Sequence, residues 1–434
     1  MKFALVGQDI PTLLPGLLAD LLFGGRTEGA DVLLLEKNPA MQEVLENYGR
    51  AILKKSGLTG SFTVSDEREE VLSGADCVIY AGDCMAASRF EQDRQALGGE
   101  KEDDPGLSDQ ARVNGGIGGL LHTLRAGEYV LELCEDMRKS CPGALVICLG
   151  QPVARMTELF LRSGFRCYGL GRSPLRGANG LDTLAKRLRK KPGDLQAEFA
   201  GLPGFSFLLE LKEADTDTDL LPKLKQAARK GELGRLSQRW LDWYEALPIG
   251  DVTDHAEFLP AQPDYIPEER PEFGESIEKR KDRILFMNTV GKNGADEREG
   301  AMAQLLLLSR VPPVRPMRLA LALLEGTDLS MQAVTRRNGS VLPQLDPDAV
   351  IEAELHLENG QENATPLTLP EPLCDILTEV DRTNRLAAAA AVGDRSALRE
   401  CVETDPALAG LDRLYCLEVV EALIAMHDDI ITRL

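Results

Sequence analysis

The chain has 434 residues, with 49 lysines and arginines against 70 aspartates and glutamates, so its formal charge is −21. Because nucleic-acid phosphates repel a polyanion and the sequence holds no stripe of basic residues, we expect no binding to DNA or RNA. A hydrophobic fraction of 43% with 27% charged residues is typical of a globular chain. The length indicates two or three domains and a large buried core.

The sequence also argues against a membrane or secreted protein. No apolar run approaches the ~20 residues that span a bilayer, and the chain opens on a strand-like run without the basic lead of a signal peptide. The nine cysteines are scattered and form no CxxC pair. Reduced, buried thiols in a cytoplasmic protein fit this pattern better than disulfides or a cysteine-built zinc site.

In the first half, short apolar runs alternate with helical stretches. The expected strands are Phe3–Val6, Asp31–Leu35, Cys77–Tyr80 and Ala144–Leu149, and the expected helices are Leu13–Phe23, Met41–Ser56 and Ala126–Lys139. Strands that are bounded by turns and alternate with helices favour an α/β fold with a doubly wound parallel sheet of the Rossmann type.

From about Gly201 the pattern changes. We expect strands at Leu208–Leu211 and Pro347–Leu357, and helices at Leu224–Tyr244, Asp375–Val392, Ser396–Glu403 and Leu411–Leu434, with a proline- and acid-rich region at Pro248–Pro271. The natural boundary lies near Gly169–Arg172. The predicted domains are therefore 1–170, a Rossmann-like domain of the NAD-binding type, and 171–434, an α/β domain for substrate binding and oligomerisation.

The loop after the first strand bears on nucleotide binding. In a doubly wound sheet this loop leads into a helix whose N-terminus can hold a pyrophosphate. Here it reads Gly7-Gln8-Asp9-Ile10-Pro11-Thr12, so only the first glycine of Gly-x-Gly-x-x-Gly is present. Asp9 would repel a pyrophosphate, whereas Glu36 ends the second strand and is either a ribose-binding acid or a solvated strand-end acid. These residues leave dinucleotide binding open.

Four further motifs occur along the chain in a specific order. They are Gly116-Ile117-Gly118-Gly119, Cys141-Pro142-Gly143-Ala144, Asn338-Gly339-Ser340 with Leu345 through Glu352, and Gly393-Asp394-Arg395 with Asp405-Pro406. In this order and spacing the sequence resembles glycoside hydrolase family 4, the NAD- and metal-dependent glycosidases, nearly from end to end.

The resemblance implies a Rossmann-like sheet with a C-terminal α/β domain of the lactate/malate dehydrogenase type. It also implies that bound NAD oxidises the sugar hydroxyl at carbon 3, after which a base, usually a tyrosine, removes the neighbouring proton and the aglycone is eliminated. Water then adds and the hydride returns. Such enzymes are exceptions to the two-carboxylate glycosidase scheme, and a divalent metal held by Cys and His polarises the oxygen at the oxidised centre.

The sequence departs from this family where the chemistry takes place. Gly171 and Arg172 occupy the positions of the metal-binding Cys-His pair, and Gly204 occupies that of the second histidine ligand. Gln151 replaces the asparagine of the sugar-contact triplet. Because glycine offers no side-chain ligand, we expect no Mn²⁺-type site.

The acidic segment Gly250–Pro260 could compensate for these losses. Asp254, His255 and Glu257, with Asp251, could bind a replacement cation or supply acid–base groups. Alternatively, the segment is a solvated acidic turn with one capping histidine. Arg172 could replace the metal as a fixed cation near a developing enolate, or be a surface ion-pair residue. The base tyrosine is not placed, and the nearest candidate, Tyr244, is better explained as a packing residue.

The residues expected to build the site fall into three groups. They are Arg172, Asp254, His255 and Glu257 for catalysis, Gly7, Asp9, Ile10, Glu36 and Gly82 for the cofactor NAD, and Gln151, Arg89, Gly118 and Arg125 for the substrate. The histidines His122, His356 and His427 are interpreted as structural, and the acidic stretch Phe90–Asp109 as a loop.

Three hypotheses remain for the function. The first is a divergent NAD-linked glycosidase, and the second is a catalytically silent homologue that serves as a structural or regulatory subunit or senses a sugar or nucleotide. A simple dehydrogenase ranks last, because no matching Arg/His catalytic set is present. The expected partners are a small sugar or glycoside and a second copy or a homologue of the chain.

Overall fold

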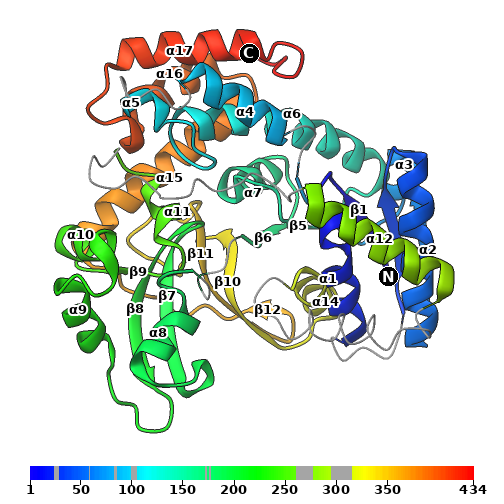
Figure 1. Cartoon of the computed structure of the whole chain (residues 1–434), viewed down its shortest axis with the longest axis horizontal. Helices are drawn as coiled ribbons and strands as arrows, with labels where there is room; N and C mark the ends of the chain where they lie inside the picture. The colour runs from blue at the N-terminus through cyan, green and yellow to red at the C-terminus, as the bar shows by residue number, and fades with distance from the viewer. Residues whose placement is uncertain are drawn as a thin grey trace.

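One continuous sheet runs through the protein, and helices pack on both of its faces (Figure 1). The structure is a computed structural model that describes residues 1–23, 29–57, 59–82, 86–98, 105–171, 174, 177–260, 277–294 and 315–434. In these residues the strand order is β3-β2-β1-β4-β5-β6-β10-β11-β7-β8-β9, with β12 beside β11. No helix of the described ranges is long and apolar enough to cross a membrane.

The first six strands are parallel and form the doubly wound half. They are β1 (Lys2–Val6), β2 (Asp31–Leu35), β3 (Phe62–Ser65), β4 (Cys77–Tyr80), β5 (Leu145–Cys148) and β6 (Cys167–Gly169). The helices of this half are α1 (Ile10–Phe23), α2 (Pro39–Ser56), α3 (Arg68–Leu72), α4 (Ala86–Ala96), α5 (Pro105–Ser108), α6 (Gly116–Ser140) and α7 (Val153–Arg162). The predicted Rossmann-like arrangement is present.

Alternate strand residues enter two separate cores. Phe3 and Leu5 of β1 pack with α1 and α2, whereas Ala4 and Val6 pack with α6 on the opposite face. This is the result expected when a parallel sheet is covered on both sides. The carboxyl ends of the strands therefore remain as the accessible edge at which loops can build a site.

The remaining strands are antiparallel. They are β7 (Leu195–Leu202), β8 (Phe205–Glu213), β9 (Leu247–Pro248), β10 (Leu329–Arg337), β11 (Val350–Glu358) and β12 (Gln361–Glu362). Their helices are α8 (Leu181–Leu188), α9 (Leu221–Arg229), α10 (Gly234–Tyr244), α11 (Val252–Ala256), α12 (Ile277–Asn293), α14 (Pro316–Glu325), α15 (Glu371–Ala391), α16 (Arg395–Thr404) and α17 (Arg413–Met426), with short 3₁₀ turns at Pro192–Asp194 and Pro406–Leu408.

The two halves join where β10 pairs with β6, and Thr335 lies opposite Gly169. The sheet changes there from parallel to antiparallel, close to the sequence-based boundary. Helices α12 and α14 nevertheless pack with α1 and α2, and α15, α16 and α17 pack with α6. The division into 1–170 and 171–434 stays a prediction.

Two expected helices are wrong in extent. The helix predicted over Leu224–Tyr244 is two helices, α9 and α10, because Gly231 (φ 74°) and Gly234 (φ 84°) take the left-handed conformation between them. The helix predicted over Leu411–Leu434 ends at Met426. Of the region Pro248–Pro271, residues 261–271 lie outside the described ranges.

The segment 427–434 follows α17 and packs along α6. Glu128 of α6 accepts hydrogen bonds at Oε1 from the backbone N–H groups of Thr432 (2.7 Å) and Arg433 (2.8 Å). Its Oε2 accepts a bond from Arg433 Nε at 3.1 Å, and Ile431 is buried. One carboxylate thus holds the segment on the helix whose N-terminal end reaches the site.

Replacing Glu128 tests this attachment. We expect Glu128→Ala to lower the free energy of unfolding by about 3 kcal/mol, because hydrogen bonds to a buried charged group are worth about 1.5–3 kcal/mol each and are not additive. The control Glu135→Ala removes a half-exposed carboxylate that pairs with the same arginine, and should cost less than about 1 kcal/mol. Urea unfolding measures both, and equal losses would contradict the attachment.

Candidate functional site

The strand connections diverge between β1 and β4, and a doubly wound fold is expected to have its crevice at this point. From β1 the chain continues to β2 on one side, and from β4 it continues to β5 on the other. Ligands of doubly wound sheets bind at such a point, beyond the carboxyl ends of the strands. Gly7 follows β1 (φ 127°) and Gly82 follows β4 (φ 78°), and a Cβ on Gly7 would lie 2.1 Å from the carbonyl oxygen of Ala81. The predicted cofactor residues Gly7 and Gly82 therefore meet at this crevice.

Asp9, in the loop after β1, contacts the loop after β4. Its backbone N–H donates to the Ala81 carbonyl oxygen at 3.0 Å. Its carboxylate covers Gly82, since a Cβ there would lie 2.4 Å from Asp9 Oδ2. The predicted cofactor position Asp9 is thus at the crevice, with its negative charge where the fold would place a phosphate.

The N–H groups of the first turn of α1 are used in local backbone hydrogen bonds. The Ile10 N–H donates to the Gly7 carbonyl oxygen at 3.2 Å, and the N–H groups of Thr12 and Leu13 donate to the Asp9 carbonyl oxygen at 3.0 and 3.1 Å. Pro11 has no N–H. Ile10 begins α1 and its side chain is fully buried in the core, and its predicted part in cofactor binding stays a prediction.

The sequence reasoning missed a cation at this loop. Arg283 of α12 donates from Nη1 to the Pro11 carbonyl oxygen at 2.7 Å. Glu36, in contrast, lies where it was expected, at the end of β2, with Oε1 accepting the Asn38 N–H at 2.9 Å. Arg283 and Pro11 are 272 residues apart in the sequence. No local sequence pattern predicts their contact, so only the fold reveals it.

Gln151 and Gly171 follow β5 and β6 at the same edge of the sheet. Gln151 is half-buried and precedes α7. A Cβ on Gly171 would lie in ordinary contact with Val153, 3.6 Å from its Cγ2. The predicted catalytic residue Arg172 lies outside the described residues.

Gly204 forms the turn between β7 and β8. Leu202 pairs with Phe205, so Pro203 and Gly204 are the two central residues of the turn, and Gly204 has φ 78°. Proline followed by a glycine at positive φ is the signature of a type II turn. A side chain at position 204 would be strained, and its Cβ would lie 4.0 Å from that of Asp254.

The polar groups of the acidic segment that contains Asp254 contact other parts of the chain. His255 is buried, with Nδ1 3.1 Å from the Asp251 carbonyl oxygen and Nε2 2.7 Å from that of Ser206. Burial lowers the pKa of His255. Both ring nitrogens face carbonyl oxygens, so acid–base work by His255 stays a prediction that requires one contact to break.

Glu257 faces the start of α6. Its Oε2 accepts hydrogen bonds from the backbone N–H and the side-chain amide of Asn114, both at 2.7 Å. Arg112 donates from Nη1 to the carbonyl oxygens of Glu257 and Leu259, also at 2.7 Å. The carboxylate therefore orders the loop before α6, and its predicted catalytic role stays untested.

The predicted substrate residues Arg89 and Arg125 belong to one buried network. Arg89 pairs with the carboxylate of Asp429, and its Nη1 lies 3.4 Å from His427 Nδ1. His427 Nε2 lies 2.6 Å from Asp93 Oδ1, and Asp93 Oδ2 lies 2.8 Å from Arg125 Nη1. The structure brings both arginines together, but it ties them to the segment 427–434.

Two other expectations concern α6. Gly118 is buried, and a Cβ there would lie 2.5 Å from the Arg112 carbonyl oxygen, so it provides close backbone packing. His122 lies 3.2 Å from the Val113 carbonyl oxygen, and burial, with the charge of Arg125, lowers its pKa to about 3. His122 is neutral, which agrees with a structural role.

Glu352 is a buried acid that the site prediction did not include. It lies on β11 opposite Thr335 and Gly201, and its Oε2 accepts a hydrogen bond from Ser206 Oγ at 2.7 Å. Burial, helped by the nearby charge of Asp254, raises its pKa to about 8. An acid inside the apolar run of a strand was the signal for it in the sequence.

The described residues do not fit the metal expected from the resemblance. No group of three or more His, Cys, Asp or Glu side chains within the described ranges could hold an ion. Gly171 and Gly204 offer no donor atom, and both His255 nitrogens face carbonyl oxygens.

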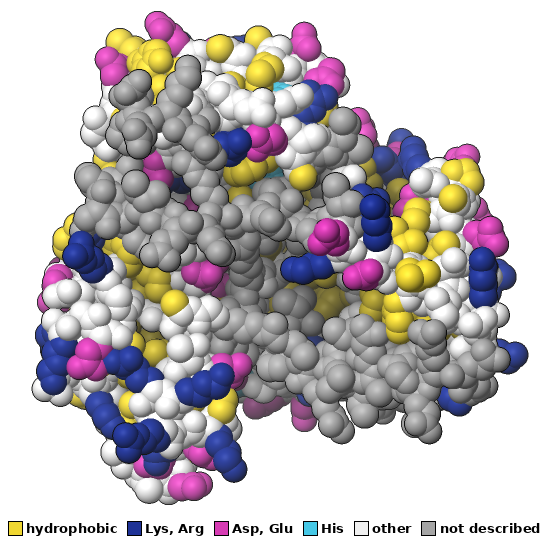
Figure 2. All heavy atoms as spheres, viewed as in Figure 1, with side chains coloured by type: hydrophobic (Ala, Val, Ile, Leu, Met, Phe, Trp, Pro, Cys, Tyr) yellow, Lys and Arg dark blue, Asp and Glu magenta, His cyan; other side chains and the backbone are white. Residues whose placement is uncertain are grey.

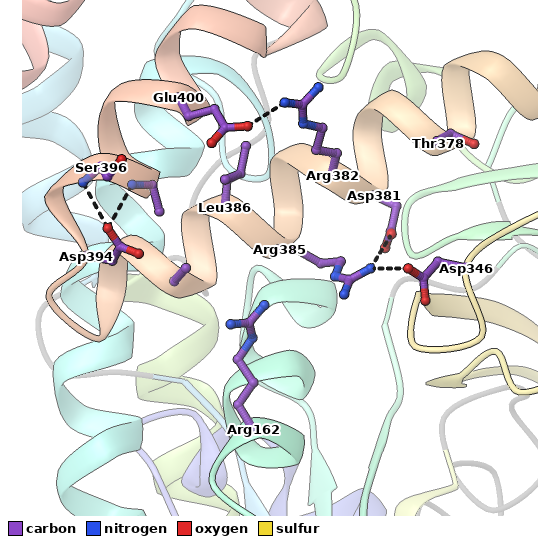
Figure 3. A pocket seen from close by; sticks show the side chains of 12 residues that line it. Arg162, Asp346, Thr378, Asp381, Arg382, Arg385, Leu386, Asp394, Ser396 and Glu400 are labelled. Carbon is purple, nitrogen blue, oxygen red and sulfur yellow. Dashed lines mark hydrogen bonds and ion pairs between the residues drawn. The ribbon is translucent and has the colours of Figure 1, made fainter.

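A separate surface hollow of about 460 Å³ lies between α15, α16 and the end of α7 (Figure 3). Arg385 pairs there with Asp346 at 2.8 Å, and Arg382 pairs with Glu400. Arg162 is paired with Glu158 at 2.5 Å. Because these arginines already have acidic partners, the hollow is lined by ion pairs, of which one joins α15 to α16 and one joins α15 to the β10–β11 connection.

Sequence comparison identifies relatives of the chain. Residues 12–175 match the model of the family 4 glycosyl hydrolases. The chain is 26% identical to an α-glucosidase of Erwinia rhapontici over 230 residues, which are 52% of this chain and 49% of that protein. It is 29% identical to an α-galactosidase of Bacillus subtilis over 120 residues, 26% of either chain. The matched segments span about half of the first relative and about a quarter of the second.

Two solved structures share the whole fold. A 6-phospho-α-glucosidase from gut microorganisms, in complex with NAD and Mn²⁺, has a TM-score of 0.73 at 17% identity, over 99% of this chain and 98% of that one. A 6-phospho-β-glucosidase from Thermotoga maritima, with NAD and glucose-6-phosphate, has a TM-score of 0.70 at 16% identity, over 99% of both chains. The predicted fold class and the resemblance to family 4 are confirmed.

Glu352 gives a pH test of this buried site. Because its folded pKa is raised from 4.5 to about 8, the folded state keeps a proton that the unfolded state releases between these pH values. The free energy of unfolding should therefore fall as pH rises through this window, by at most about 1.4 kcal/mol per pH unit from this group.

Glu352→Gln removes the titration and keeps an oxygen that can accept from Ser206. We expect its stability to vary less with pH than that of the unaltered chain, and to exceed it at pH 8, in urea unfolding from pH 5 to 8. The control Glu358→Gln changes an exposed acid on the same strand and should leave the slope intact. A slope that Glu352→Gln does not reduce would contradict the assignment.

Proposed function

Taking the chain as a divergent relative of the family 4 glycosyl hydrolases, we propose that it binds NAD and a small sugar without the metal-assisted cleavage typical of that family. It then acts as a catalytically silent homologue that senses nucleotide or sugar, alone or as a structural or regulatory subunit beside an active relative. A second copy of the chain or a homologue is the expected protein partner.

The turn at Gly204 carries the proposal. It offers no ligand atom, and its positive φ disfavours any residue that would. The loss is therefore built into the backbone of the β7–β8 turn. Gly171 stands at the other expected ligand position and also lacks a donor side chain. Both expected ligand positions, on separate loops, therefore hold glycine.

The nucleotide end supports NAD binding. Gly7 and Gly82 bring two loops together at the crevice, and Glu36 ends β2 where an acid can accept hydrogen bonds from ribose hydroxyls. NAD, when bound, supplies a hydride acceptor. Asp9 weakens its attachment, because the carboxylate lies beside the position expected for the pyrophosphate.

One observation favours a second candidate, an NAD-linked oxidation–elimination that cleaves a glycoside. Asp254 lies beside Gly204, and Glu352 nearby keeps its proton near neutral pH. These acids, or Arg172, would then take over charge stabilisation from the metal. This candidate ranks second because both carboxyls are buried, each less than one-twentieth exposed.

Calorimetry with NAD tests the proposal on the purified chain. We expect heat of binding that saturates, with an affinity that Mn²⁺ leaves unchanged, because glycine stands at both metal-ligand positions. No binding up to millimolar NAD would contradict the nucleotide part of the proposal. Tighter NAD binding in the presence of Mn²⁺ would contradict the metal-free part.

Hydrogen exchange separates the two candidates. A panel of glycosides and 6-phosphoglycosides is incubated with the chain and NAD in D₂O, and deuterium at carbon 2 of the sugar is measured by NMR. The silent homologue predicts no incorporation beyond a sample without protein. Incorporation that requires NAD would establish the oxidation step and favour the second candidate.

A further inference from the structure

Helix α17 exposes apolar side chains on the outside of the protein. It packs on α16 and α6 and lies along the upper edge of the molecule in Figure 1, where Figure 2 shows hydrophobic side chains with acidic ones beside them. Within the described ranges six large hydrophobic side chains are exposed, and three of them belong to α17, namely Leu414 (73%), Tyr415 (51%) and Met426 (40%). Because single exposed apolar residues are ordinary whereas a cluster on one helix is not, this surface indicates an interaction site.

Two apolar stripes run along α17. The first is buried in the core that α6 and α16 share, and it consists of Cys416, Val420 and Leu423. The second begins one residue earlier and lies about 100° round the helix, and it consists of Tyr415, Val419, Ala422 and Met426. Three of its members are exposed, and Val419 is half-buried. Spacings of four and three residues are the pattern by which one helix packs along another, and α17 has this pattern twice.

The exposed stripe is complementary to itself. Tyr415 and Met426 lie equally far from the midpoint of the stripe, and so do Val419 and Ala422. In an antiparallel pair of these helices about a two-fold axis, each Tyr415 therefore faces Met426 of the second copy, and each Val419 faces Ala422. The small Ala422 allows a close approach of the two helices, and a thioether against an aromatic ring is a favourable contact. A two-fold axis makes both contacts twice and closes the assembly at a dimer.

The charges beside the stripe argue against a lipid surface as the occupant. Glu418 and Glu421 are exposed on the neighbouring side of α17, and the exposed Asp428 and Asp429 follow the helix. Arg395 of α16 pairs with Glu421 at 3.6 Å. A helix that lies on a membrane carries lysine and arginine beside its apolar face, because anionic headgroups repel acids. The occupant is therefore a protein surface.

We propose that α17 is a dimer interface, at which the stripe from Tyr415 to Met426 packs antiparallel on the same stripe of a second copy of this chain. The inference rests on the protein partner expected in the proposed function and adds the surface and its chemistry. Each copy has a formal charge of −21, so the apolar contact forms against charge repulsion. Salt screens that repulsion and strengthens apolar contacts. The dimer is therefore tighter at high salt than at low salt.

Sedimentation equilibrium over a concentration series tests the interface. We expect the unaltered chain to form a reversible dimer whose dissociation constant falls as NaCl is added. Ala422→Glu should weaken the dimer by at least about tenfold, because it places an unpaired charge from each copy in the apolar contact. The control Leu285→Glu adds the same charge at a residue of α12 that is 65% exposed, and should change the dissociation constant by less than about twofold. Circular dichroism checks that both variants keep their helices.

Disulfide formation tests the antiparallel arrangement. A chain with both Tyr415→Cys and Met426→Cys should become a covalent dimer on mild oxidation, because each new thiol faces its counterpart in the second copy. Either change alone should give no more covalent dimer than the unaltered chain with its own cysteines. Efficient linkage by the single variants would indicate a parallel pair and would overturn the antiparallel interface.

The remaining outcomes separate the inference from the proposed function. A monomer throughout the series, a dimer that Ala422→Glu leaves intact, or a dimer that salt weakens would each overturn the inference. A chain that binds NAD as a monomer would lose the interface and keep the nucleotide part of the proposed function. A dimer that Ala422→Glu dissociates, in a chain that binds no NAD, would keep the interface and overturn that nucleotide part.

Discussion

The close approach of the loops after β1 and β4 determines what the rest of the site can do. Gly7 packs against the Ala81 carbonyl at a distance that a side chain would forbid, and the Asp9 N–H bonds to that same carbonyl. This contact joins the two loops directly before the start of α1. It also turns the Asp9 carboxylate over Gly82, so the contact that brings the two loops together places an acid beside them.

In the antiparallel half, the polar side chains of the acidic segment are hydrogen-bonded to backbone groups. Asp251 caps α11 by accepting the Thr253 N–H at 3.0 Å, and His255 and Glu257 bond to the backbones of their neighbours. A residue held in this way orders a loop, but it has little freedom to ligate a metal or exchange a proton. The composition of the acidic segment therefore suggests catalysis, whereas its hydrogen bonds hold the local backbone in place. The alternative of a solvated acidic turn with a capping histidine does not describe the segment either, because Asp254 and His255 are buried and the cap of α11 is Asp251.

The sequence predicted the elements that depend on local patterns. Apolar runs such as Cys77–Tyr80 gave the correct strands, whereas β3 (Phe62–Ser65) was missed because it is short and half polar. Glycines at 231 and 234 broke an expected helix, since the amphipathic pattern continues across the break while the backbone does not. The places of Gly7, Asp9 and Glu36 after β1 and β2 were predictable because strand ends of a doubly wound sheet share one edge. Arg283 was not, because its contact with Pro11 depends on how α12 docks on α2.

Manganese binding tests most directly our proposal that the chain works without a metal-assisted step. Electron paramagnetic resonance of free Mn²⁺ is recorded while the intact chain is added, with NAD and with glucose-6-phosphate present. The account predicts that the free-ion signal stays unchanged at equimolar protein, because the described residues offer no ligand set. A stoichiometric loss of the signal that depends on NAD would contradict the account.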